Sequence, residues 1–107
     1  WTPAWARPKA SQQETTHTYL DADHYDDFAD FVAAFVARYR GRVDHVIVWN
    51  EPNLASEWGG NVPSAAGYTA LLQAGSQGVK AGSPEKAAAS ARKPSAQSGQ
   101  APAWRCR

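Results

Sequence analysis

Apolar residues recur at helical spacing over residues 23–40, and this is the clearest periodic signal in the chain. One face of such a helix would carry Tyr25, Phe28, Val32, Phe35, Val36 and Tyr39, with Phe31 at its edge. Asp21 or Asp23 can cap the first turn, and Gly41 follows an arginine-rich last turn. The pattern therefore predicts a helix over residues 23–40.

A continuous apolar run over residues 46–49 has no polar alternation, which is typical of a strand covered on both faces. A second helix is predicted over residues 64–81, between Pro63 and Gly82. Residues 1–8 have the composition of a strand end that passes into a loop. The order of strand end, helix, strand and helix predicts an α/β fold with a parallel sheet.

The pattern stops after Glu85. Residues 86–107 contain no Val, Ile, Leu or Phe, and their five basic residues face no acidic residue, whereas residues 1–85 carry a net charge of −4. This composition predicts a disordered, low-complexity basic tail. A parallel α/β chain should supply another apolar strand a few residues after Gly82, so a frameshift near residues 83–90 is a second hypothesis. Five positive charges without a fold behind them do not indicate a nucleic-acid partner.

Composition narrows the class of protein further. A chain of 107 residues with 43% hydrophobic residues has the size of one small domain. No apolar run approaches the roughly 18 residues that span a bilayer, so we expect no membrane partner. His17, His24 and His45 lack metal-ligand spacing, and the single Cys106 excludes an internal disulfide, so we expect no metal and no cofactor.

The predicted strand runs directly into "WNEPN", residues 49–53. This motif resembles the acid/base signature of clan A glycoside hydrolases, which are retaining enzymes built on a (β/α)8 barrel. "TPAWARP" resembles the end of the third strand of that family, and "EWGG" with "YTALLQAG" resembles the loop and helix after the fourth strand. The resemblance covers residues 1–85 and implies a partial TIM barrel domain: the end of the third strand, the third helix, the fourth strand and the fourth helix.

The resemblance also implies a chemistry for the motif. Glu51 would be the general acid/base, which protonates the departing glycosidic oxygen and later deprotonates water. Asn50 would hydrogen-bond the sugar 2-hydroxyl, and Pro52 would restrict the backbone after the acid. The alternative is an ordinary turn, because Asn and Pro are common turn residues.

Sugar contacts are predicted from the aromatic and polar residues around the motif. Trp58 and Trp5 are candidate stacking platforms, and the alternative for both is an aromatic side chain packed under a loop. Asn53 and Glu57 are candidates for the leaving-group side.

The sequence thus predicts a fragment of a retaining glycoside hydrolase of carbohydrate metabolism, acting on a β-linked glycoside or polysaccharide. In the family the nucleophile is a second carboxylate on a later strand, which this sequence does not reach, so we expect the isolated chain to be inactive. Two alternatives remain: a non-catalytic carbohydrate-binding or interaction module on the same scaffold, and an unrelated α/β domain in which the motif is coincidental.

Overall fold

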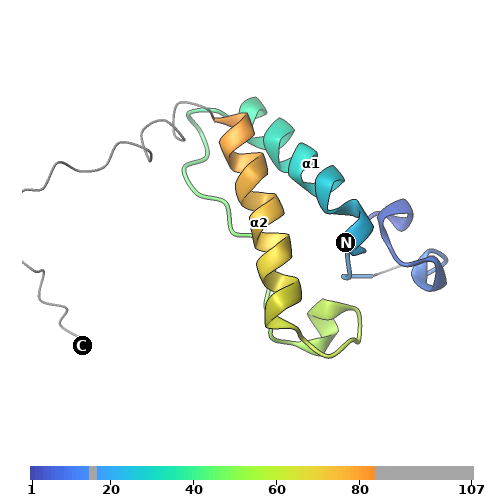
Figure 1. The fold of residues 1–107 in the computed structure, drawn as a ribbon. Helices are drawn as coiled ribbons and strands as arrows, with labels where there is room; N and C mark the ends of the chain where they lie inside the picture. Colours follow the sequence, from blue (N-terminus) through green and yellow to red (C-terminus); the bar gives the residue numbers. More distant parts are fainter. Residues whose placement is uncertain (15–16, 84–107) are drawn as a thin grey trace, which may run out of the picture.

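The computed structural model describes residues 1–14 and 17–83. Two helices dominate it: α1 (Tyr25–Arg38) and α2 (Ala65–Gly82). They lie side by side and run in the same direction, and the segment between them returns along α2 before a loop leads into that helix (Figure 1). Short 3-10 helices are present at Ala4–Ala6, Lys9–Ser11, Ala22–His24 and Ala55–Trp58.

Both helices predicted from the sequence are confirmed, with ends within a few residues of those expected. The 3-10 turn before α1 is capped by Asp21, whose carboxylate accepts a hydrogen bond from the backbone N–H of Asp23. Ser64 caps α2 by accepting from the backbone N–H of Gly67 at 3.1 Å. Such caps act within a few residues and do not depend on the rest of the fold, which is why the sequence predicts the Asp21 cap.

The two helices approach closely because α2 presents glycines to α1. A Cβ added at Gly82 would lie 2.5 Å from the carbonyl oxygen of Ala33, and one added at Gly78 would collide with the carbonyl oxygen of Ala29. The carbonyl of Gly82 also accepts a 3.0 Å hydrogen bond from the Arg40 guanidinium, beyond the end of α1. The C-terminal ends of the helices are therefore held together.

The predicted α/β fold is wrong, and with it the partial TIM barrel. The described residues contain no strand and no sheet, and the helices pack directly on each other. A strand exists only when a neighbour completes its ladder of hydrogen bonds, and residues 46–49 have no such neighbour within the described ranges. Ile47 is 89% exposed while Val48 is buried, so only one face of this segment is covered. The predicted strand end at residues 1–8 contains a 3-10 turn, Ala4–Ala6, instead.

The small core lies where residues 43–49, called the return segment below, and the loops meet α2. Leu71, Trp58, Leu20, Val48 and Ala6 form one buried cluster. A Cβ added at Gly75 would lie 2.6 Å from Val48, and the phenol of Tyr68 donates a 3.1 Å hydrogen bond to the Val48 carbonyl. The end of the return segment is thereby fixed against α2, immediately before the Asn-Glu-Pro motif.

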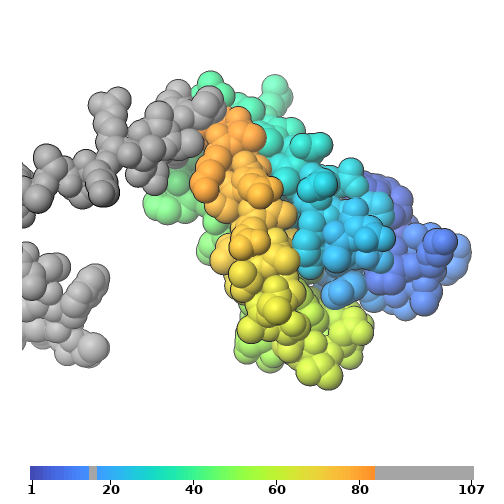
Figure 2. Space-filling view, in the orientation of Figure 1, coloured from blue at the N-terminus to red at the C-terminus, as the bar shows by residue number. Residues whose placement is uncertain are grey.

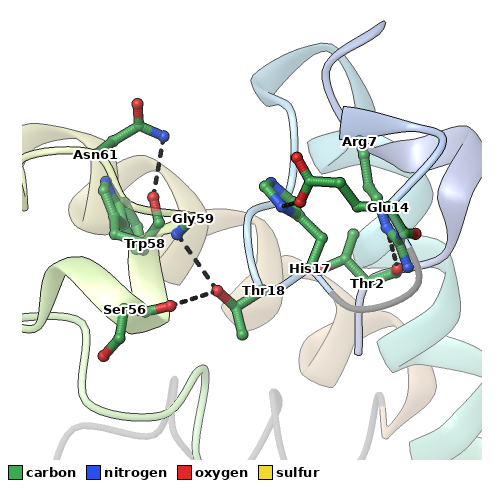
Figure 3. Close-up of polar contacts among 9 residues, drawn as sticks. All are labelled: Thr2, Arg7, Glu14, His17, Thr18, Ser56, Trp58, Gly59 and Asn61. Carbon is green, nitrogen blue, oxygen red and sulfur yellow. Dashed lines mark hydrogen bonds and ion pairs between the residues drawn. The ribbon is translucent and has the colours of Figure 1, made fainter. Parts of the chain in front are cut away.

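The N-terminal segment packs beside the beginning of α1, on the side away from α2 (Figure 2). Its backbone is joined to residues 17–21 by hydrogen bonds from Thr2 to His17 and from Asp21 to Ala6, both 3.0 Å long. The buried guanidinium of Arg7 donates to the carbonyls of Thr2 and Glu14 at 2.6 Å (Figure 3). These bonds set the position of the tryptophans of this segment.

Neither helix in the described part of the chain is long and apolar enough to cross a bilayer. The predicted basic tail, residues 86–107, and the frameshift hypothesis lie outside the described residues.

Candidate functional site

A cavity of about 510 Å³ lies between the N-terminal segment, the beginning of α1 and the motif segment. Its walls are mainly aromatic, supplied by Trp1, Trp5, Phe28, Phe31 and Trp49. Trp1 and Trp5 are 84% and 59% exposed, so their rings are accessible from solvent. Accessible indole faces beside a concavity suit the stacking of a flat, partly apolar ligand.

One polar edge of the cavity comes from the first turns of the α1 region. His24 Nδ1 and Asp27 Oδ2 are hydrogen-bonded at 2.8 Å, and both residues line the cavity. The Trp5 ring meets the His24 ring edge-on, with centroids 5.3 Å apart. Trp5, His24 and Asp27 thus form a connected group, although only Trp5 was predicted as a site residue.

Further polar lining residues come from the motif and the loop after it. Asn50 and Glu57 both line the cavity. The indole of Trp49 donates a 2.9 Å hydrogen bond to the backbone carbonyl of Glu57, which ties the two segments together. The sequence-predicted residues Trp5, Asn50 and Glu57 are therefore brought to one cavity.

Glu51 lies next to this cavity in the chain but is not among the residues that line it. Its side chain is exposed, and its backbone has φ 39°, while Trp49 has φ 67°. Both are left-handed conformations that non-glycine residues seldom adopt, and such strain costs about 1–3 kcal/mol for each residue. Asn50 therefore lies between two residues with strained backbone conformations. Such strain is found most often at functional sites.

Trp58 and Asn53 lie elsewhere. Trp58 is only 4% exposed and packs edge-on against Tyr19 and Trp49, with centroids 5.9 and 6.1 Å away, so it takes the packed position rather than a place on the cavity wall. Asn53 is exposed and does not line the cavity.

The loop around Trp58 is anchored by side chains (Figure 3). The Thr18 hydroxyl donates to the Ser56 carbonyl at 2.8 Å and accepts from the Gly59 backbone N–H at 3.3 Å. Asn61 donates to the Trp58 carbonyl at 3.0 Å. Gly59 has φ 63°, and an added Cβ would lie 2.5 Å from Tyr19, so a side chain would be excluded here.

Sequence reasoning missed Trp1, His24, Asp27 and Phe31 as cavity residues. Their approach to Asn50 is a long-range contact, which no local spacing announces. The tryptophan-rich composition of residues 1–5 is the one signal that could have indicated it.

Two further properties bear on the chemistry. Within residues 1–14 and 17–83, no three His, Cys, Asp or Glu side chains are grouped to hold a metal ion.

Burial raises the pKa of the Tyr25 phenol, and the nearby Tyr19 and Asp21 raise it further because their charged forms repel a phenolate. The phenol of Tyr25 therefore stays neutral to a higher pH than that of an ordinary tyrosine.

Comparison of the chain with models of known protein families, with curated proteins and with solved structures found no match.

Proposed function

We propose that this chain carries the sugar-binding and acid/base part of a retaining glycoside hydrolase site, with Glu51 as the general acid/base. The observation that supports the proposal is the position of Asn50: the residue before the motif glutamate lines the same aromatic cavity as Trp1, Trp5 and Trp49. A pyranose ring stacked on these indoles would lie beside the Asn50 amide, one residue from the carboxylate.

In this proposal Asn50 donates to the sugar 2-hydroxyl, and Glu51 delivers a proton to the glycosidic oxygen at the edge of the cavity. Retaining hydrolysis also needs a nucleophilic carboxylate roughly 5 Å from the acid/base. The resemblance assigns that role to a segment outside this sequence. The isolated chain is accordingly expected to bind a β-linked glycoside without cleaving it.

The second candidate is a non-catalytic carbohydrate-binding module. It is favoured by the exposure of Glu51 and by the absence of this side chain from the cavity wall. In a binding module the aromatic cavity alone would determine the affinity for sugar, and the carboxylate of Glu51 would not contact the ligand.

Isothermal titration calorimetry with cellobiose and xylobiose tests whether the cavity binds sugar. Trp5→Ala should lower the affinity about five- to tenfold, because stacking on an aromatic ring contributes about 0.5–1.5 kcal/mol beyond the area buried. Tyr39→Ala, which removes a half-exposed aromatic side chain outside the cavity, should leave the affinity unchanged. Absence of binding by the unaltered chain would contradict both candidates.

The two candidates are separated by the side-chain carboxyl ¹³C resonance of Glu51 during the same titration. An acid/base beside the glycosidic oxygen should shift as sugar binds, and the shift should saturate with the calorimetric affinity. Glu14, whose carboxylate pairs with His17 outside the cavity, provides the reference resonance. A constant Glu51 resonance with saturating sugar would favour the binding module.

A further inference from the structure

The charges around the cavity indicate which kind of sugar it takes. We propose that the site prefers a sugar bearing a protonated amine, such as a glucosamine unit, over its neutral counterpart. This inference rests on the proposed sugar-binding function and adds a substrate class to it. Three observations support it: an unpaired carboxylate, a second acid nearby, and an aromatic wall.

The first observation is the Glu57 carboxylate. The backbone of Glu57 is fixed, because its N–H donates to the Leu54 carbonyl at 3.1 Å and its carbonyl accepts from Trp49 at 2.9 Å. Glu57 is half-buried as a residue, and its carboxylate has no hydrogen-bond or ion-pair partner among the described residues. This carboxylate is therefore available to a cation that enters the cavity, and a charge-assisted hydrogen bond to an ammonium group is stronger than one to a neutral hydroxyl.

The second observation is Asp27, which lines the same cavity from α1. One of its oxygens, Oδ2, is bonded to His24 Nδ1, which leaves Oδ1 available to a ligand. No Lys or Arg is found among the described residues that line the cavity. The wall therefore carries two carboxylates against one positive group, the α-ammonium of Trp1, and this balance favours a cation.

The third observation is the aromatic wall itself. Trp1, Trp5 and Trp49 present ring systems to the cavity, and indole is the aromatic group that attracts a cation most strongly. An ammonium group placed here would gain both ring and carboxylate contacts, whereas a hydroxyl at the same carbon would gain neither charge contact. The aromatic faces would meanwhile stack on the pyranose ring of either sugar.

The test compares the β-1,4-linked glucosamine disaccharide with cellobiose, which carries hydroxyls in place of the amines. Affinities are measured by calorimetry on the full chain at neutral pH and low ionic strength. We expect the amino sugar to bind about fivefold more tightly, and the preference to shrink as salt is raised, since exposed charges are screened.

Glu57→Gln keeps the shape of the side chain and removes its charge, so it should bring the ratio of the two affinities close to one, whatever its effect on cellobiose itself. Asp26→Asn removes one negative charge from the same region of α1 without touching the cavity, and should keep the preference. The salt titration of the unaltered chain provides a reading that does not depend on any variant folding.

The outcomes separate the two proposals. Equal affinity for both disaccharides, or a preference that Glu57→Gln and salt leave intact, would overturn the amino-sugar inference and leave the sugar-binding function standing. Failure of both disaccharides to bind would overturn the proposed function itself.

Discussion

The indole Nε1 of Trp49 donates a 2.9 Å hydrogen bond to the backbone carbonyl of Glu57. This bond joins the end of the return segment to the 3-10 helix Ala55–Trp58, and it closes the loop that carries the Asn-Glu-Pro motif. The Trp49 ring also packs edge-on against the buried Trp58, with centroids 6.1 Å apart. One side chain therefore supports the motif loop and forms part of the cavity wall.

Replacing this indole by Phe tests its structural role. Trp49→Phe removes the donor and leaves the Glu57 carbonyl without its partner, so we expect the free energy of unfolding to fall by about 1–2 kcal/mol in urea denaturation. Trp1→Phe, at a position that is 84% exposed, should change it by less than about 0.5 kcal/mol. Equal effects at the two positions would show that the Trp49 hydrogen bond contributes nothing.

The close approach of the helices predicts opposite effects for one substitution at two positions of α2. Gly78→Ala places a methyl group against the Ala29 carbonyl and Val32, so it should destabilise the fold by about 1–3 kcal/mol. At Gly67 the nearest atom is 3.4 Å away, so Gly67→Ala should stabilise by up to about 1 kcal/mol through helix propensity. Thermal unfolding of both variants decides the matter, and destabilisation of equal size would contradict the packing described.

The strained backbone at Glu51 predicts a stabilising substitution. Asn adopts left-handed conformations more readily than Glu, so Glu51→Asn should raise the free energy of unfolding by about 0.5–1 kcal/mol. Ala55→Asn, at an exposed residue without positive φ, should give no gain. A loss of stability at position 51 would indicate that the Glu51 backbone is relaxed.

Tyr25 predicts a decline in stability at alkaline pH. Its pKa is raised in the folded chain, so the unfolded chain releases the phenolic proton first. The contribution of Tyr25 is fully present below the unfolded value of about 10 and is lost as the pH rises through the folded pKa. Tyr25→Phe should flatten this part of the pH–stability curve, measured by urea denaturation. An unchanged slope in the variant would exclude Tyr25 as the cause.

The parts of the fold that the sequence predicts are the local ones. Helical periodicity between Pro63 and Gly82 locates α2, and the apolar stripe locates α1, because these signals act within a few residues. The apolar run at residues 46–49 does not form a strand, since a strand depends on a partner elsewhere in the chain. Half-burial of Val46 beside exposed Ile47 reflects that missing partner.

The candidate site likewise contains residues that the sequence predicts and residues that only the folded structure brings together. Asn50 and Trp5 were predicted from residue type and a motif, and both line the cavity. His24 and Asp27 were not predicted as site residues, because only the folded position of the N-terminal segment brings them near the motif. Trp58, attractive as a platform by type alone, is buried by Tyr19 and Trp49.

The indole N–H resonances of the tryptophans test the central claim most directly, because Trp1, Trp5 and Trp49 line the cavity and Trp58 does not. In a ¹H–¹⁵N titration with cellobiose and the glucosamine disaccharide, we expect saturable shifts at Trp5 and Trp49 while Trp58 changes little. Shifts of Trp58 equal to those of Trp5, or no shifts at saturating sugar, would contradict a sugar site in this cavity.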